Sequence, residues 1–259
     1  MTPTFTVILL AGDRAGDPLA EIAPGKRKAL LPLRGKPMIL YVLETLSAVP
    51  MIGDIVVVAN SVTVIENNPA VAAFARTRPL RFVEGASGPA ASVVVAAQGL
   101  AGPVLVTTAD NPLLSAATLA DFCSQALESN ADVVVGLASE KTIRKAFPAA
   151  RRSYLRLRGG GVNGCNLFAG EAVALMQAAR GWGEVENKRK TPLAFIAHFG
   201  FFTLLRALTG MLSLDNALAA VSRTLGLRAG AVMLDDPLAA MDVDRFEHVA
   251  MAEMVLTRL

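Results

Sequence analysis

A glycine-bearing loop with a basic far end is the first place in this chain where residue types and spacing suit chemistry. An apolar run at residues 6–10 stops at Gly12, and Gly16 follows four residues later. Glycine lets the backbone bring its N–H groups close to an anion. Arg14 and the basic run at residues 26–28 add positive charge that can neutralise phosphates. The stretch therefore predicts a phosphate-binding loop, with an ordinary strand-to-helix turn as the alternative.

Carboxylates follow two later apolar runs. Asp110 ends one of them, and Asn111-Pro112 then forces a turn. Because Mg²⁺ takes one or two carboxylates plus substrate phosphate oxygens, Asp110 is a candidate metal ligand; the alternative is a residue that stabilises the bend. Asp242 and Asp244 lie two residues apart, so an extended backbone would point both carboxylates to the same side. Asp244 is otherwise a candidate N-cap of a helix expected over residues 245–256.

A second loop of small residues spans positions 84–92. It follows a predicted strand and opens a predicted helix, so a flat ligand could lie against its backbone. Ser92 stands at the start of that helix, where a hydroxyl that caps the helix is the alternative to a ligand contact.

Strands and helices alternate along the chain. Apolar, β-branched runs predict strands, and stretches with helical spacing lie between them. The predicted strands cover residues 6–10, 54–58, 80–83, 104–107, 132–136 and 231–234. The clearest predicted helices cover residues 37–47, 90–100 and 116–128. This order predicts an α/β fold, a single Rossmann-like domain with a mostly parallel sheet and helices on both faces. Ligands of such sheets bind at the carboxyl ends of the strands, which would bring the three loops to one cleft.

Composition narrows the function classes. The chain has 259 residues, 53% of them hydrophobic, which suits one large globular domain. The formal net charge of +3 suits an enzyme with anionic substrates and is too small to indicate a nucleic-acid partner. The apolar segment 193–214 carries His198, Arg206 and two glycines, so no membrane-spanning helix is expected. We expect a cytoplasmic protein in which this segment is a buried helical pair or a homodimer contact, with contact to a membrane surface as the alternative.

The motif around the basic cluster resembles a known family. Lys28-x-Leu30-x-Pro32-Leu33-x-Gly35-Lys36-Pro37-Met38 is similar to the second half of the signature of nucleotidyltransferases with the nucleotide-diphospho-sugar transferase fold. Leu10-Ala11-Gly12 is similar to the start of its first half. The group includes sugar-phosphate nucleotidyltransferases, methylerythritol-phosphate cytidylyltransferase and molybdenum-cofactor guanylyltransferase. Residues 110–114 resemble the metal-binding turn of the family, and residues 242–249 resemble its last acidic segment.

The resemblance implies a reaction and a role for each matched residue. The phosphate of an acceptor attacks the α-phosphorus of a nucleoside triphosphate and releases pyrophosphate. Lys28, with Arg14, would stabilise charge on the phosphates, while Leu10, Ala11, Gly12 and Asp110 would bind the nucleotide. Mg²⁺ would be held by Asp110 and Asp244. Gly85 and Ser92 would face the base, which favours CTP and leaves GTP open. An ionised phosphate nucleophile needs no general base.

The phosphate loop departs from the family pattern. The family has a second glycine where this chain has Asp13, and an arginine near the position of Asp17. An Asp beside a triphosphate is repulsive unless a cation intervenes. Two other functions therefore stay open: a glycosyltransferase of the same fold, and a non-catalytic nucleotide-binding regulator. The first would be expected to carry an Asp-x-Asp motif where this chain has only Asp110.

The acceptor is expected to be a phosphorylated small molecule. Two basic runs and a glycine-rich stretch lie in residues 141–214, which we interpret as an acceptor-side insertion. The nucleotide-binding half would cover residues 1–140, and residues 215–259 would return to the core with the second metal-site acid. Candidate acceptor contacts are Gly164, Asn166, Lys188 and Lys190. A solvated charged surface is the alternative for the lysines.

Overall fold

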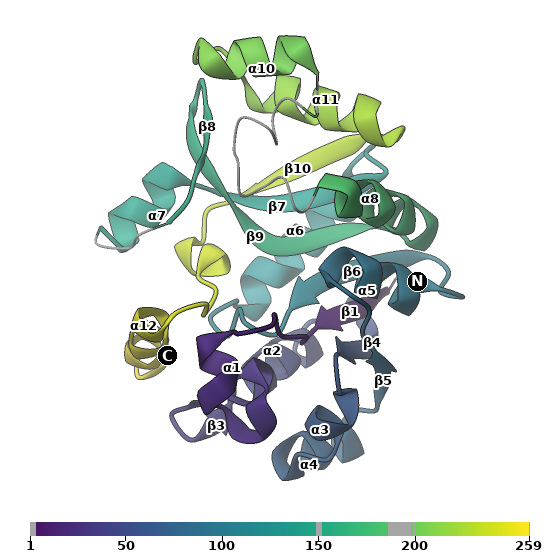
Figure 1. Cartoon of the computed structure of the whole chain (residues 1–259), viewed down its shortest axis with the longest axis vertical. Coiled ribbons are helices and arrows are strands. Elements are labelled where there is room, and N and C mark those ends of the chain that lie inside the picture. The colour runs from purple at the N-terminus through teal and green to yellow at the C-terminus, as the bar shows by residue number, and fades with distance from the viewer. Residues whose placement is uncertain (1–3, 149–151, 186–197, 199, 259) are drawn as a thin grey trace.

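The computed structural model describes residues 4–148, 152–185, 198 and 200–258 (Figure 1). Lys188 and Lys190 lie outside the described residues, as does most of 193–200.

One mixed sheet forms the centre of the molecule. Its strands are β1 (Phe5–Leu10), β4 (Ile52–Ala59), β5 (Leu80–Glu84), β6 (Pro103–Thr108), β7 (Val133–Ser139), β8 (Leu155–Leu157), β9 (Gly160–Glu171) and β10 (Ala229–Leu234). They run in the order β10-β7-β9-β6-β1-β4-β5, and β8 pairs with β9 at its side. The pairs among β1, β4, β5 and β6 are parallel, as is β7 with β10, whereas β9 is antiparallel to β6, β7 and β8. The predicted α/β, mostly parallel sheet is confirmed.

Helices cover both faces of this sheet (Figure 1). They are α1 (Pro18–Ile22), α2 (Met38–Ser47), α3 (Val62–Glu66), α4 (Pro69–Thr77), α5 (Pro89–Ala97), α6 (Ala116–Glu128), α7 (Glu140–Ala146), α8 (Ala172–Val185), α10 (Phe201–Leu208), α11 (Leu214–Leu225) and α12 (Phe246–Leu256). Short 3₁₀ turns occur at η1 (Pro24–Lys26), η2 (Lys28–Leu30) and η4 (Pro237–Ala240).

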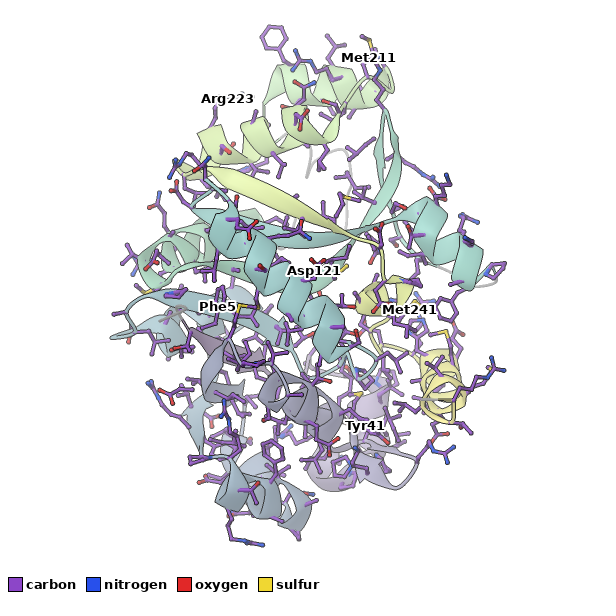
Figure 2. The ribbon with its side chains drawn as sticks, turned by 180° about the vertical axis from the view of Figure 1, so that it is seen from behind. Phe5, Tyr41, Asp121, Met211, Arg223 and Met241 are labelled. Carbon is purple, nitrogen blue, oxygen red and sulfur yellow. The ribbon has the colours of Figure 1, made fainter. Side chains whose placement is uncertain are left out.

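The strands alternate their side chains between two hydrophobic cores. In β1, Val7 and Leu9 are buried in the larger core with α2 and α6, and Ile8 is buried in the smaller core with α5 and α8. This is the period of two expected for a strand that is buried on both sides. Figure 2 shows α6, marked by Asp121, lying along one face of the sheet, far from the α10–α11 end marked by Met211 and Arg223.

The second half of the signature motif forms a small hairpin. Strands β2 (Pro32–Leu33) and β3 (Lys36–Pro37) pair antiparallel, and the turn between them consists of Arg34 and Gly35. Both turn residues have positive φ, 49° and 79°, as a two-residue hairpin turn of the favoured type requires. Tyr41 of α2 donates its hydroxyl hydrogen to the Leu33 carbonyl over 2.9 Å. This part of the motif therefore holds the chain in place after Lys28. Its residues are not among those that line the cavity described below.

The residues expected on the acceptor side contribute a central strand. β9 lies between β6 and β7, and sequence patterning missed it because its glycines and asparagines look like a loop. Positive φ at Asn166 (53°) accompanies a register shift in its pairing with β7, which is the signature of a bulge. The predicted division at residue 141 stays a prediction.

The α10 helix and the turn after it expose apolar side chains. Leu205 is 45% exposed, Leu208 62% and Met211 60%. None of the helices that the structure describes has the length and apolarity needed to span a bilayer. A homodimer through this segment stays a prediction.

Candidate active site

Four loops meet at the carboxyl ends of the parallel strands. Backbone hydrogen bonds continue the sheet one residue beyond these ends: Ala11 N–H donates to Val58 O, Ala109 N–H to Leu10 O, and Gly85 N–H to Ala59 O, each over 2.8–2.9 Å. The loops that begin at Ala11, Asn60, Gly85 and Asp110 are therefore fixed beside one another. Their convergence is what the parallel topology predicts.

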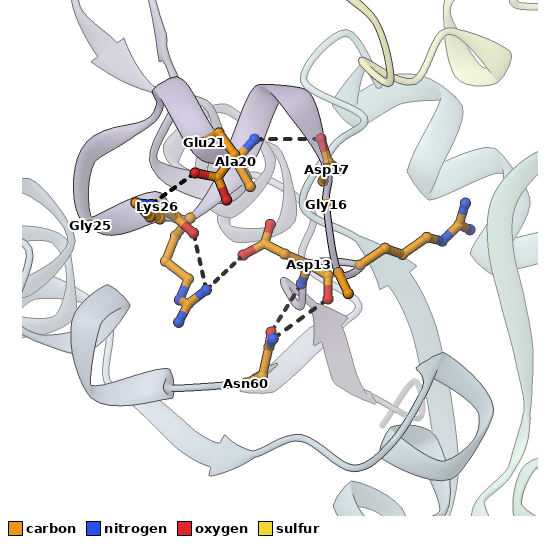
Figure 3. Close-up of a pocket in the computed structure, with 11 residues that line it drawn as sticks. Asp13, Gly16, Asp17, Ala20, Glu21, Gly25, Lys26 and Asn60 are labelled. Carbon is orange, nitrogen blue, oxygen red and sulfur yellow. Dashed lines mark hydrogen bonds and ion pairs between the residues drawn. The ribbon is translucent and has the colours of Figure 1, made fainter.

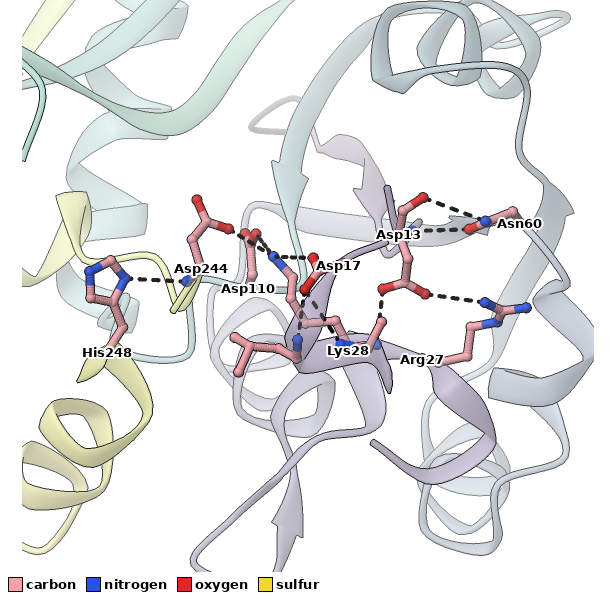
Figure 4. Close-up of polar contacts among 10 residues, drawn as sticks. Asp13, Asp17, Arg27, Lys28, Asn60, Asp110, Asp244 and His248 are labelled. Atoms are coloured by element: carbon pink, nitrogen blue, oxygen red, sulfur yellow. Dashed lines mark hydrogen bonds and ion pairs between the residues drawn. The ribbon is translucent and has the colours of Figure 1, made fainter. Parts of the chain in front are cut away.

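Lys28 links two carboxylates from distant parts of the chain (Figure 4). Its Nζ lies 2.7 Å from Asp110 Oδ2 and 2.9 Å from Asp244 Oδ1, with Asp17 Oδ2 at 4.0 Å. The Lys28 side chain is only 10% exposed. The structure thus brings together the three residues that the sequence analysis assigned to metal and phosphate chemistry.

Charge pairing dominates the protonation of this cluster. Burial alone would lower the pKa of Lys28, but the carboxylates of Asp110 and Asp244 raise it above its ordinary value. Burial likewise acts to raise the pKa of Asp244, and the Lys28 ammonium outweighs it and lowers that pKa. Arg14, an exposed loop residue, lowers the Asp244 pKa further. The ammonium and the Asp244 carboxylate are both charged at neutral pH.

Asp110 fits a ligand of a divalent cation. Its Oδ2 accepts from Lys28, whereas its Oδ1 is buried without any hydrogen-bond partner. A carboxylate oxygen in that state lacks a cation or a donor. The Val243 N–H donates to the Asp110 carbonyl over 2.8 Å, which brings the segment before Asp244 against the Asp110 turn. Both carboxylates contact the same Lys28 ammonium, so their oxygens lie close to one point. A Mg²⁺ site shared by Asp110 and Asp244 stays a prediction.

Asp13 and Asp17 have structural partners. Asp17 is the N-cap of α1, where its Oδ1 accepts from the Leu19 and Ala20 N–H groups at 2.9 and 3.4 Å. Asp13 Oδ1 accepts from the Lys28 N–H over 2.9 Å, and its Oδ2 faces Arg27 Nη1 at 3.4 Å. Burial raises the pKa of Asp13, and these two contacts partly oppose that rise. The two acids therefore brace the loop, which the sequence did not reveal.

A cavity of about 360 Å³ opens beside this loop (Figure 3). Its lining combines the glycine loop with the η1 turn and the residue that follows β4. The lining residues are Asp13, Arg14, Ala15, Gly16, Asp17, Ala20, Glu21, Gly25, Lys26, Arg27 and Asn60. Asn60 holds the loop in place, because its Oδ1 accepts from the Asp13 N–H over 3.0 Å. The predicted phosphate loop thus borders a real cavity with three cationic side chains.

The loop after β5 is closed by Ser92. Its hydroxyl oxygen accepts from the Ala86 N–H over 3.0 Å, so the side chain points back to the loop. A Cβ on Gly85 would lie 3.2–3.3 Å from Ala59, Asn60 and Ser92, so glycine permits the close approach. The helix-capping alternative for Ser92 does not hold, because α5 begins at Pro89 with Gly88 as its N-cap.

Asp242 and Asp244 have different partners. Arg152 contacts the Asp242 carboxylate through Nη1 and donates from Nη2 to the Asp242 carbonyl over 3.1 Å. Burial and the neighbouring Asp244 raise the pKa of Asp242, while Arg152 opposes them. The Asp244 N–H donates to His248 Nδ1 over 3.2 Å, and Arg245 rather than Asp244 is the N-cap of α12. Neither Arg152 nor His248 had a sequence signal beyond its charge or type.

The neighbourhood of Asp110 also includes β9. The buried Asn111 side chain donates to the Ala239 carbonyl over 2.8 Å and to the Cys165 carbonyl over 3.4 Å. Gly164 and Asn166 flank Cys165, so the β9 bulge lies against the Asp110 turn. Contact of these two residues with an acceptor stays a prediction.

Comparisons with known proteins agree with this geometry. The family model described as the MobA-like NTP transferase domain matches residues 7–224. A hypothetical transferase from Thermus thermophilus is 31% identical and superposes with a TM-score of 0.80, covering 95% of this chain and 99% of its own.

Two further solved structures share the fold at low identity. The 4-diphosphocytidyl-2C-methyl-D-erythritol synthase of Anaerococcus prevotii is 11% identical, with a TM-score of 0.62 over 99% of this chain and 97% of its own. A CMP:2-keto-3-deoxy-manno-octonic acid synthetase solved with CTP is 13% identical, with a TM-score of 0.57 over 99% of both chains. No curated protein matches the chain significantly.

Proposed function

Since this chain belongs to the family of MobA-like NTP transferase domains and is a nucleotidyltransferase, we propose that it transfers a nucleoside monophosphate from CTP to a phosphorylated small-molecule acceptor. Pyrophosphate is the other product, Mg²⁺ is the cofactor and GTP is the alternative donor. The observation that carries the proposal is the bridge from Lys28 Nζ to Asp110 and Asp244, next to the glycine loop, whose Asp13 accepts from the Lys28 N–H.

The reaction needs charge stabilisation more than proton transfer. An acceptor phosphate oxygen forms a bond to the α-phosphorus, the bond from that phosphorus to the bridging oxygen breaks, and the electron pair leaves with pyrophosphate. Since the nucleophile is already ionised at neutral pH, no group has to remove a proton. The main task is to hold negative charge that moves during the step.

Lys28 supplies one fixed positive charge for that task. Its ammonium is buried and charged, and its long side chain can move from the carboxylates to phosphate oxygens. Backbone N–H groups of the glycine loop would orient the leaving pyrophosphate. When bound at Asp110 and Asp244, Mg²⁺ would neutralise charge on the phosphate oxygens.

The base preference rests on the loop after β5. Gly85 and Ser92 keep this loop tight against β4, and its backbone is available to read an edge of a base. One protein of the same fold, at 13% identity, was solved with CTP, which supports a cytidine nucleotide as the first candidate.

The sequence of the Asp110 turn speaks against the glycosyltransferase alternative. An Asp-x-Asp motif that begins or ends at Asp110 would need a second acid at position 112 or 108, where this chain has Pro112 and Thr108. Asn111 is 1% exposed, and its side chain donates to two backbone carbonyls, which holds the turn in place.

A pyrophosphate-release assay tests the proposal. The four nucleoside triphosphates are incubated with the protein, Mg²⁺ and a panel of phosphorylated sugars, polyols and cofactor precursors, with EDTA added in a parallel set. We expect release with CTP and at least one acceptor, abolished by EDTA. Nucleotide binding without turnover across the panel would point to a regulator, and glycosyl transfer from a nucleotide-sugar would point to the other enzyme.

A further inference from the structure

Arg27 lines the cavity, and the mechanism above leaves it unused. Its Nη1 lies 3.4 Å from Asp13 Oδ2 and donates to the Lys26 carbonyl over 3.0 Å. Its Nε is buried and has no hydrogen-bond partner. Because solvent does not reach Nε, a ligand in the cavity would not reach it either. Nη2 makes no hydrogen bond to any residue that the structure describes, and the Arg27 side chain is 19% exposed. The Nη2 end of the guanidinium is therefore left for an anion in the cavity.

Arg14 and Arg27 act on different neighbours. The charge of Arg14 lowers the pKa of Asp244, on the side of the carboxylates. Glu84, at the end of β5, has its pKa lowered first by the N–H groups of Val62 and Ser61 and then by the charge of Arg27. Both arginines line the cavity, Arg14 from the glycine loop and Arg27 from the residue that follows η1.

Asp13 ties Arg27 to Lys28. One oxygen of its carboxylate accepts from the Lys28 backbone and the other faces the Arg27 guanidinium (Figure 4). The Asp13 side chain is 5% exposed, and Asn60 holds its backbone N–H. The charge of the Asp13 carboxylate is neutralised by Arg27, and the carboxylate fixes both the Lys28 backbone and the Arg27 side chain in place.

We propose that Arg27 is a triphosphate-binding residue of this chain and that Asp13 positions it. The Nη2 end of the guanidinium can donate to phosphate oxygens while Nη1 keeps its contacts with Asp13 and the Lys26 carbonyl, in a fixed planar geometry that an ammonium lacks. Asp13 then occupies a glycine position of the family without repelling the nucleotide, because it pairs with the arginine that binds the phosphates. The inference rests on the proposed function for the identity of the ligand, a nucleoside triphosphate.

Binding of phosphates of different length tests Arg27 without turnover. Arg27→Gln, Arg27→Lys and the wild type are titrated calorimetrically with CTP, GTP, inorganic pyrophosphate and CMP. Arg76→Gln is the matched control, because Arg76 is exposed on α4 and does not line the cavity. We expect Arg27→Gln to weaken pyrophosphate and the better-binding triphosphate at least tenfold and CMP less than twofold. Arg27→Lys should fall between, and Arg76→Gln should resemble the wild type.

Asp13→Asn tests the positioning role. The amide oxygen can still accept from Lys28, but the charge that holds Arg27 is gone. We expect triphosphate affinity to fall about threefold, and Asp13→Asn with Arg27→Gln to be no weaker than Arg27→Gln alone, because both act through one contact. Thermal melts of each variant establish that it is folded.

Several outcomes separate this inference from the proposed function. Equal losses for CMP and CTP in folded Arg27→Gln, or triphosphate affinity equal to that of Arg76→Gln, would overturn the role of Arg27. So would a wild type that binds neither triphosphates nor pyrophosphate. Selective loss of triphosphate binding in a protein that transfers no nucleotide would support Arg27 and overturn the proposed transfer. If the wild type transfers a nucleotide and Arg27→Gln binds triphosphate as tightly as the wild type, the proposed transfer is supported and the role of Arg27 is overturned.

Discussion

Two charged clusters meet at residues 27 and 28 and are built differently. The Lys28 side chain joins Asp110 and Asp244, which come from distant segments, and one carboxylate oxygen in this cluster lacks a partner. The Asp13 carboxylate joins Arg27 and the Lys28 backbone within a single loop. The first cluster holds charges that a ligand can redistribute, and the second holds a backbone in place. The loop therefore combines an exchangeable ion pair and a fixed one at two adjacent residues, Lys28 and Arg27.

The largest expected effect is loss of transfer in Lys28→Met. This change removes the fixed positive charge while keeping a long side chain, so the rate of pyrophosphate release should fall at least about a hundredfold, the scale for a lost electrostatic donor. Steady-state kinetics at saturating nucleotide and acceptor measure it. Lys36→Met is the control, because Lys36 pairs with Glu44 and does not line the cavity. A fall of less than fivefold in Lys28→Met would contradict the role given to its charge.

The losses of turnover caused by Asp110→Asn and by Asp244→Asn should differ in size. Asp110 is 18% exposed and Asp244 49% exposed, so the Asp110 charge acts in a less screened environment. We expect Mg²⁺-dependent turnover to fall by about a hundredfold for Asp110→Asn and by less for Asp244→Asn. The exposed Asp235→Asn serves as the control. Unchanged turnover in Asp110→Asn would refute its assignment as a metal ligand.

Metal binding without nucleotide should become tighter in Lys28→Met. In the wild type the Lys28 ammonium already pairs with both carboxylates, so a divalent cation has to displace it. Without it, Asp110 and Asp244 repel each other and gain more from a cation. Mn²⁺ titrations followed by electron paramagnetic resonance should give a dissociation constant about tenfold lower in Lys28→Met than in the wild type. A weaker constant would mean that Lys28 supports the ion instead of competing with it.

The smallest effect concerns the pH dependence of stability at Asp13. Its pKa is raised in the folded protein above the ordinary 3.8, so the folded state binds the proton more tightly than the unfolded state. Its contribution to stability is therefore greatest below about pH 3.8 and is lost as the pH rises through the folded value. Relative to the wild type, Asp13→Asn should gain stability as the pH rises across that interval. Urea unfolding in EDTA at several pH values measures the difference, and an opposite slope would contradict the sign.

Much of the fold could be predicted from local patterning. The β-branched runs predicted six strands, all with parallel partners in the sheet, within a few residues of their observed bounds, and the predicted helix at residues 116–128 is α6. β9 was missed, since a bulged strand rich in glycine and asparagine lacks the alternation that identifies strands. Its place between β6 and β7 depends on pairing with residues far along the chain, which composition does not encode.

The residues of the site likewise divide into those that motifs identified and those that only the fold revealed. Lys28, Asp110 and Asp244 were identified from motifs, and the structure places both carboxylates in contact with the Lys28 ammonium. Arg152 was one of several arginines with no distinguishing pattern, and only the fold pairs it with Asp242. The sequence indicated that Asp13 and Asp17 would repel a triphosphate, because their backbone N–H partners and the Arg27 partner of Asp13 cannot be read from residue types.

By itself, the sequence determined the class of fold, the family and the three charged residues at the centre of the site, because burial patterns and short motifs are local. Only the tertiary structure decided which charges pair. Ion pairing depends on distances of a few ångströms between side chains far apart in the chain, and on burial, which sets how strongly each pair interacts. It also decided that Asp13 holds Lys28 and Arg27 in place at the loop where phosphate is expected to bind.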